Sequence, residues 1–300
     1  MRLSDISRRK IDAESSEFIR KCIEWDTPRL ANEVLPHGVT SITDIPYDPD
    51  KGEEGLLDIY FPGDSEDRFD EAFFLIHGGA FVYGNKELDK NYGMHLALRS
   101  GLPVINVNYT LMPKTDLAGQ SEELCFALSF LNSRYGLTRI HTTGDSAGAY
   151  LALLIALLCN DKKIRQDLHV TSDPKAKCLS AGLICGCFIR NKNDFPGLYM
   201  YNGGTVPKYI LDLSKTCVTS FTENGNIPIT IVTGDNDTML KECTTFKKTL
   251  DKAGIPNSFY NASSSEGRTM FHVFPISNPT WPESQKVIDM FADLAKTAKN

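Results

Sequence analysis

The sequence predicts an α/β fold, in which a mostly parallel sheet carries helices on both faces. Short runs rich in β-branched and aromatic residues alternate with longer runs of helical pattern, and such alternation leads to parallel strands joined by right-handed crossovers. A serine between two glycines stands where a strand-like run meets a helix-like run, and a second pair of glycines follows another strand-like run. Both patterns are typical of loops that project from the edge of such a sheet.

The elements follow in a regular order. Strands are expected at about 39–46, 55–61, 72–77, 103–108, 138–143, 178–185, 227–233 and 256–261, and helices near 88–100, 116–134, 146–159, 238–253 and 282–298. The first two strands precede any of these helices, so we expect them to form an antiparallel edge of the sheet.

We expect residues 1–300 to form one domain with a small helical cap, contributed by about 1–37 and about 187–225. The first segment places Ile11, Phe18, Ile19, Cys22 and Ile23 on one helical face. The second is rich in aromatic residues and is inserted where it would cover the carboxyl edge of the sheet. These aromatic residues either line a substrate pocket or pack the core of the cap. Candidate pocket residues are Tyr83, Phe188, Tyr199, Tyr201 and Phe271.

Composition narrows the class of protein. A net charge of −6, with Lys and Arg scattered along the chain, gives no basic field for a nucleic acid. The longest apolar run, at 147–159, is too short to span a bilayer, and the first residues lack the apolar core of a signal peptide, so a cytoplasmic location is expected. Eight cysteines are spread without metal-ligand spacing, which predicts buried free thiols and no metal site.

Ser146 is the candidate nucleophile. It stands at the centre of Gly144-Asp145-Ser146-Ala147-Gly148, after a strand-like run and before an apolar helical run. A serine on such a sharp turn projects its hydroxyl from the sheet edge, and the turn needs small neighbours. Gly144 and Gly148 meet that need.

The oxyanion hole is expected from two segments. After the apolar run 72–76, Gly78 and Gly79 would expose backbone N–H groups to a ligand oxygen, and Ala147 would add the N–H that follows the nucleophile. His77 precedes this pair. It is a conceivable general base, but its position before Ser146 in the chain favours a role in bracing the loop.

The base and the acid should follow the serine in the chain. Of the two later histidines, His169 lies in a polar segment with no strand end before it, whereas His272 lies between the last strand and the last helix. We therefore choose His272. Asp235 and Asp237 both follow the buried run 227–233. Either could orient the imidazole, and each has a plainer reading, Asp235 as a turn residue and Asp237 as a helix N-cap.

Together these motifs resemble the hormone-sensitive-lipase-like esterases of the α/β-hydrolase fold. The resemblance spans roughly residues 40–298 and includes an HGG loop, a GDSAG elbow, an acid in a D-x-L-like context and a histidine followed by x-Phe. It implies that Asp237 is the acid. It also implies hydrolysis of small-molecule esters with short to medium acyl chains, through a Ser-His-Asp acyl-enzyme and without a cofactor. The third glycine of the family's HGGG loop is Ala80 here, which suggests a divergent branch.

Two other functions use the same scaffold. The triad could attack an amide, a formamide or an acetylated sugar. A non-catalytic small-molecule receptor is the other alternative, although hydrolase-like receptors lose the triad histidine and this chain keeps His272. An exposed cap or edge strand would also support a homodimer.

Overall fold

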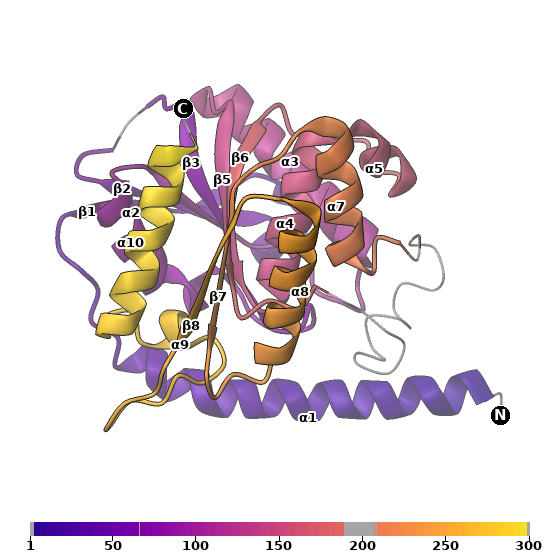
Figure 1. The fold of residues 1–300 in the computed structure, drawn as a ribbon, viewed down its shortest axis with the longest axis horizontal. Coiled ribbons are helices and arrows are strands. Elements are labelled where there is room, and N and C mark those ends of the chain that lie inside the picture. The colour runs from indigo at the N-terminus through magenta and orange to yellow at the C-terminus, as the bar shows by residue number, and fades with distance from the viewer. Residues whose placement is uncertain (1–2, 66, 189–206, 208, 299–300) are drawn as a thin grey trace.

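A computed structural model describes the backbone of residues 3–65, 67–188, 207 and 209–298. Its centre is an eight-stranded sheet of order β1-β2-β4-β3-β5-β6-β7-β8 (Figure 1). The strands are β1 (Val39–Pro46), β2 (Leu56–Pro62), β3 (Glu71–Ile76), β4 (Val104–Val107), β5 (Arg139–Asp145), β6 (Lys177–Ile184), β7 (Ile229–Gly234) and β8 (Asn257–Ala262).

The strands from β4 to β8 in this order pair in parallel, whereas β2 is antiparallel to both of its neighbours, β1 and β4. The predicted α/β class and the antiparallel edge are thus confirmed. Strands β3, β4 and β7 are buried along their whole length, as expected for strands covered on both faces by helices.

Helices cover the two faces of the sheet (Figure 1). One face carries α2 (Lys90–Ser100), α9 (Phe274–Ser277) and α10 (Pro282–Thr297), whose apolar residues share one buried cluster. The other face carries α3 (Leu117–Tyr135), α4 (Ala147–Asn160), α7 (Leu213–Asn224) and α8 (Leu240–Ala253). The helix α5 (Lys162–Asp167) and two 3₁₀ segments, η1 (Pro49–Gly55) and η2 (Lys86–Leu88), complete the layers.

Local signals explain the main boundaries. Asp116 caps α3 by accepting the N–H of Gly119, and Gly136 ends the helix with φ 86°, a left-handed conformation that suits glycine. Helix α4 is buried from Ala147 to Leu158, because an apolar surface on all sides requires cover on all sides.

The two segments expected to form the cap differ in how they pack. Helix α1 (Leu3–Ala31) runs along the carboxyl edge of the sheet (Figure 1). In the second expected segment, however, α7 packs against α4 and α8 and buries Leu213, Cys217 and Phe221 in the main core. That part is therefore a helix of the layer and not a cap. Residues 189–206 and 208 lie outside the described part of the chain.

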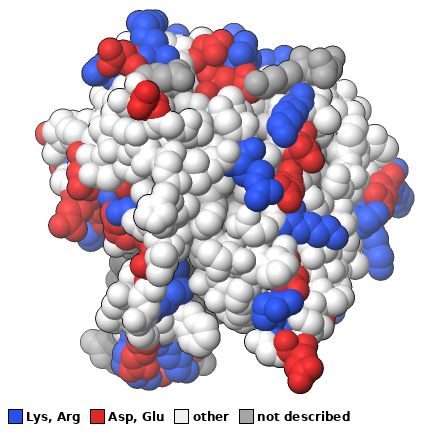
Figure 2. Space-filling model, turned by 90° about the vertical axis from the view of Figure 1, so that its left-hand side faces the viewer, with Lys and Arg blue, Asp and Glu red and all other residues white. Residues whose placement is uncertain are grey.

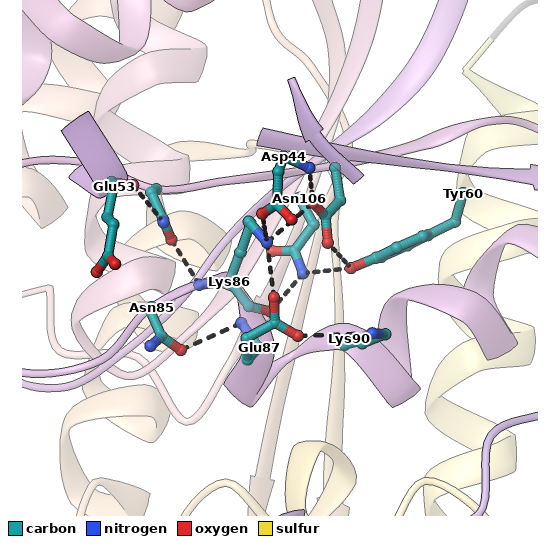
Figure 3. A network of polar contacts seen from close by, with 10 residues as sticks. Asp44, Glu53, Tyr60, Asn85, Lys86, Glu87, Lys90 and Asn106 are labelled. Atoms are coloured by element: carbon teal, nitrogen blue, oxygen red, sulfur yellow. Dashed lines mark hydrogen bonds and ion pairs between the residues drawn. The ribbon is translucent and has the colours of Figure 1, made fainter. Parts of the chain in front are cut away.

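A buried lysine ties the sheet edge to the segment that precedes α2 (Figure 3). Lys86 Nζ lies 2.9 Å from Asp58 Oδ1 on β2, 2.8 Å from Asp44 on β1 and 2.6 Å from Glu87. Its backbone is held as well, since Asn106 on β4 donates to its carbonyl at 2.6 Å. Desolvation alone would lower the pKa of Lys86, but the surrounding carboxylates raise it above its usual value.

Charges on the side of the molecule that carries β1, α2 and α10 are mixed. Lys and Arg are interspersed there with Asp and Glu (Figure 2). Among the described residues, none of the helices has the length and apolar character needed to cross a membrane.

Candidate active site

Ser146 lies on a sharp turn between β5 and α4. Its φ of 51° and ψ of −114° are unfavourable for a residue with a side chain, and such strain is typical of functional sites. The turn also packs closely against the end of β3. A Cβ atom on Gly148 would stand 2.0 Å from Ile76 O, and one on Gly144 would stand 2.4 Å from the same atom. Only glycine fits at these two positions.

A continuous chain of hydrogen bonds joins Ser146 to a histidine and an acid. Ser146 Oγ lies 2.9 Å from His272 Nε2, and His272 Nδ1 lies 2.7 Å from Asp237 Oδ1. The three residues come from the turn after β5, the turn after β7 and the loop between β8 and α9. The carboxyl ends of parallel strands therefore bring together groups that lie 126 positions apart in the chain.

Asp237, and not Asp235, contacts the imidazole. Burial alone would raise the pKa of Asp237, but the bonds from His272, the N–H of Met239 and the hydroxyl of Thr233 lower it below the usual range. Asp235 points elsewhere, because its carboxylate accepts the N–H of Ser264 at 2.7 Å.

The glycine loop, which carries Gly78 and Gly79 after β3, lies beside Ser146. One of the N–H groups expected to form the oxyanion hole is already bonded within the protein. The N–H of Gly78 donates to Asp145 Oδ1 at 2.8 Å, so this donor is already engaged inside the protein. The N–H groups of Gly79, Ala80 and Ala147 donate to no acceptor within the described part of the chain. All three residues line a cavity beside Ser146.

His77 braces the glycine loop. Its ring stacks on Tyr109 with centroids 4.4 Å apart, and Nδ1–H donates to the carbonyl of Gly78 at 2.8 Å. Complete burial lowers the pKa of His77 to about 4, so the ring is neutral at physiological pH. These contacts agree with the bracing role and leave His272 as the imidazole beside the serine.

The comparisons with known proteins bear on this geometry. Residues 57–189 match the sequence profile of the family described as BD-FAE. The structure is similar to that of esterase B from Lactobacillus rhamnosis inhibited by a C4-C4 SN3 tributyrin phosphonate, with a TM-score of 0.83 and 23% identity over 97% of this chain and 96% of that chain. The chain has the α/β-hydrolase fold.

More distant structures share that fold. An esterase of the bacterial hormone-sensitive lipase family matches with a TM-score of 0.65 and 17% identity, over 90% of this chain and 88% of that chain. Esterase LipW from Mycobacterium marinum matches with a TM-score of 0.67 and 20% identity, over 97% of this chain and 90% of the other.

The cavity measures about 520 Å³ and opens beside Ser146. Helix α1 forms one wall with Phe18, Cys22 and Trp25, and the ring of Trp25 meets that of Phe271 edge-on with centroids 5.7 Å apart. Most of the Trp25 side chain stays accessible, at 60% exposure, so it stands at the mouth.

The five candidate pocket residues divide. Tyr83 and Phe271 line the cavity. Phe188 does not, and the candidate assignment was wrong for this residue: its ring is fully buried against Phe246 on α8, with centroids 4.4 Å apart, and belongs to the main core. Tyr199 and Tyr201 lie outside the described part of the chain.

A polar contact that the sequence did not suggest joins α1 to the glycine loop. Asp26 accepts the hydroxyl of Tyr83 at 3.0 Å and the guanidinium of Arg29 at 2.9 Å. Arg29 also donates to the carbonyl of Leu88 at 3.2 Å. Asp26 and Arg29 are both largely shielded from solvent, which makes such charge-assisted bonds stronger than exposed ones.

Another unexpected feature is a pair of buried carboxyl groups beneath Ser146. Asp89, at the start of α2, lies in hydrogen-bonding contact with Asp145, and both are buried. Desolvation raises the pKa of Asp145 to about 6 and that of Asp89 well above its usual value. These directions indicate that Asp89 keeps its proton at neutral pH while Asp145 is ionised, because two neighbouring buried carboxyl groups cannot both ionise at low cost.

A single group of three possible metal ligands occurs in the described residues, namely Cys185, Asp237 and His272. Their ligand atoms lie within 4.8 Å of one another. The imidazole and the carboxylate are bonded to each other, so we interpret the group as part of the Ser146–His272–Asp237 arrangement.

Proposed function

We propose that this protein hydrolyses carboxylic esters with short to medium acyl chains through a Ser-His-Asp acyl-enzyme. The observation that supports it most directly is the unbroken chain of bonds from Ser146 Oγ to Asp237, set at a cavity of about 520 Å³. The wall of that cavity is largely apolar and includes Met239, Phe271 and Ile276, which suits an acyl chain.

The first half of the reaction forms the acyl-enzyme. His272 Nε2 takes the proton of Ser146 as Oγ attacks the substrate carbonyl, and Asp237 stabilises the imidazolium that forms. We place the oxyanion against the N–H groups of Gly79, Ala80 and Ala147, since Gly78 donates to Asp145. Each such donor lowers the barrier by about 3 kcal/mol in comparable sites. Collapse of the intermediate expels the alcohol, which receives the proton from His272.

The second half uses water. His272 removes a proton from the water as it attacks the acyl carbon, and Ser146 leaves with that proton when the carboxylic acid is released. Every proton is carried by groups of this chain. The tributyrin phosphonate in the structure of the similar esterase B supports a preference for short acyl chains here.

Replacement of the nucleophile tests the proposal. We expect Ser146→Ala to lower kcat for p-nitrophenyl butyrate by about 10⁶-fold, as loss of a nucleophilic serine does elsewhere, and to abolish labelling by a fluorophosphonate. Ser264→Ala, a change at the same edge of the sheet, should leave both unchanged. Ester hydrolysis at the normal rate by Ser146→Ala would refute the mechanism. Lack of labelling in the unmodified protein would favour the receptor alternative.

The acid can be tested with a matched pair. Asp237→Asn should lower kcat by about 10⁴-fold, because an asparagine favours the wrong imidazole tautomer. Asp235→Asn alters a carboxylate whose partners within the described residues are Asn236 and Ser264, and it should stay within about two-fold of the unmodified rate. Equal losses in the two variants would contradict the assignment of Asp237.

The cysteines support a further proposal about the compartment. All eight are free and six are buried, a pattern typical of a reducing environment. We propose the cytoplasm, which fractionation of the native source would test.

A further inference from the structure

Cys185 stands directly behind the acid and the histidine of the proposed triad. It follows the last residue of β6, is fully buried, and adopts φ 49°, a left-handed conformation. Its N–H donates to Val232 on β7 at 2.7 Å, which continues the sheet beyond the strand end. The backbone therefore turns sharply at this point and directs the thiol toward the segments that follow β7 and β8.

The thiol lies between these two segments. Sγ accepts the N–H of Val273 at 3.3 Å, and it lies within 4.8 Å of a carboxylate oxygen of Asp237. One atom thus lies beside both the acid and the residue that follows His272, although these residues belong to different loops. Burial raises the pKa of the Cys185 thiol, so the S–H donor is retained at neutral pH.

The backbone that the sulfur holds is strained. Val273 has φ 56°, and a β-branched residue in the left-handed region is a genuine outlier that persists only where its surroundings fix it. The short helix α9 begins directly after it. The bond from Val273 N–H to Cys185 Sγ is one of the contacts that fix this turn, and the turn sets the direction of the His272 ring.

We propose that Cys185 is a positioning residue of the triad: its thiol holds Asp237 by the S–H and the His272 turn by Sγ, and so keeps the imidazole aligned with Ser146. This role rests on the proposed hydrolytic function. Cys185 takes no part in proton transfer with the substrate. Its positioning role explains why a polar atom with both donor and acceptor capacity lies at this buried position.

Three variants separate positioning from simple packing. We expect Cys185→Ala to lower kcat for p-nitrophenyl butyrate about ten-fold with KM unchanged within about two-fold, since small errors in the placement of reacting groups affect the chemical step. Cys185→Ser should recover most of the loss, because its hydroxyl also donates and accepts. Cys217→Ala, which removes a buried thiol of α7 that has no polar partner among the described residues, should leave kcat unchanged.

A spectroscopic measurement reports on the same contact without substrate. The proton shared by His272 Nδ1 and Asp237 should give a low-field ¹H NMR resonance, assigned by its loss in His272→Gln. In Cys185→Ala this resonance should shift or broaden, and in Cys185→Ser it should return. If Cys185→Ala does not fold, Cys185→Gly, which suits the left-handed backbone, takes its place.

The outcomes are distinct. An unchanged kcat and an unchanged resonance in Cys185→Ala would overturn the positioning role, and so would equal defects in the Ala and Ser variants. Failure of the proposed function would instead show as a lack of Ser146-dependent hydrolysis in the unmodified protein. In that case the resonance alone decides the role of Cys185.

Discussion

Asp89 and Asp145 form a pair of buried carboxyl groups beneath Ser146. Asp145 accepts the N–H of Gly78 at 2.8 Å and so holds the first glycine of the loop. A buried carboxylate beside a second carboxyl group is costly unless one of them keeps a proton. The proton that Asp89 keeps therefore lets Asp145 act as an acceptor close to Ser146.

This pair should make the stability of the fold depend on pH. The pKa of both groups is raised in the folded protein, to about 6 for Asp145 and well above the usual value for Asp89, whereas an unfolded Asp titrates near 4. The folded state therefore binds the extra protons. Stability that the pair contributes is complete below about pH 4 and is lost as pH rises through the folded pKa values.

Asp89→Asn should prevent much of the loss of stability that occurs as the pH rises. An asparagine cannot ionise, yet its amide can donate to Asp145 as the protonated acid does. We expect the melting temperature of Asp89→Asn to exceed that of the unmodified protein by an amount that is small at pH 4 and grows toward pH 8. Thermal unfolding followed by circular dichroism over this range measures it. Asp64→Asn, at an exposed turn, should show no such trend, and a difference that is constant with pH would contradict a proton kept on Asp89.

At the residue scale, local sequence patterns predicted residues of the site that lie far apart in the chain. Ser146 and His272 were predicted from the turn glycines and from chain order. In the structure, Ser146 Oγ and His272 Nε2 lie 2.9 Å apart. Cys185 and Asp89 carried no signal, because a single cysteine or aspartate looks the same in the sequence whether or not it meets a partner from a distant loop. The engagement of Gly78 depends on the direction of one side chain, that of Asp145.

At the scale of elements, the strands and the core helices were predicted within a few residues. These elements could be predicted because the turn residues and apolar runs that mark them are local features of the sequence. Helices α5, α7 and α9 were not predicted. The first and last are only 6 and 4 residues long, too short for a periodic pattern. Helix α7 was assigned to the cap because it follows an aromatic segment, and its burial becomes clear only from its packing on α4.

Helix α1 is tied to the glycine loop by polar contacts. Its described portion covers the cavity but leaves Trp25 and Ile23 largely exposed, so apolar burial alone holds it weakly. The bonds from Asp26 to Tyr83 and from Arg29 to Leu88 are specific ties. Both end on the segment that carries Gly79, Ala80 and Asp89, so the position of α1 is coupled to that of the glycine loop.

Loss of this tie should therefore affect catalysis. Arg29→Met removes the bond to Leu88 and leaves Asp26 without its guanidinium partner, and we expect kcat/KM for p-nitrophenyl butyrate to fall about ten-fold as the loop loses its alignment. Arg20→Met is the matched control on the same helix, since the partners of Arg20 in the described part of the chain are the exposed Glu17 and Glu24, and its kcat/KM should stay within about two-fold. Equal activities of the two variants would show that α1 does not position the loop.

At the scale of the whole molecule, a buried polar network joins the antiparallel edge of the sheet to the parallel part that carries Ser146. The sequence predicted the order of elements, but not this junction, because its members come from β1, β2, β4 and η2. Lys86 meets Asp58 and Asp44 there, and Tyr60 donates to Asp58 while Asn106 donates to Tyr60 (Figure 3). The segment so anchored leads directly into Asp89 and α2.

The side chains of Lys86 and Asp58 are almost fully buried, with exposures of 4% and 0%. Breaking this ion pair should therefore strongly destabilise the fold. Lys86→Met leaves the carboxylate of Asp58 without its cation, and we expect the free energy of unfolding in urea to fall by about 3–5 kcal/mol. The double variant Lys86→Met/Asp58→Asn should recover part of this loss, since no unpaired charge then remains. Lys114→Met, which breaks an exposed pair with Glu54, should change stability by less than about 0.5 kcal/mol. If Lys86→Met proved as stable as Lys114→Met, the buried pair would not be what anchors the antiparallel edge to the parallel part of the sheet.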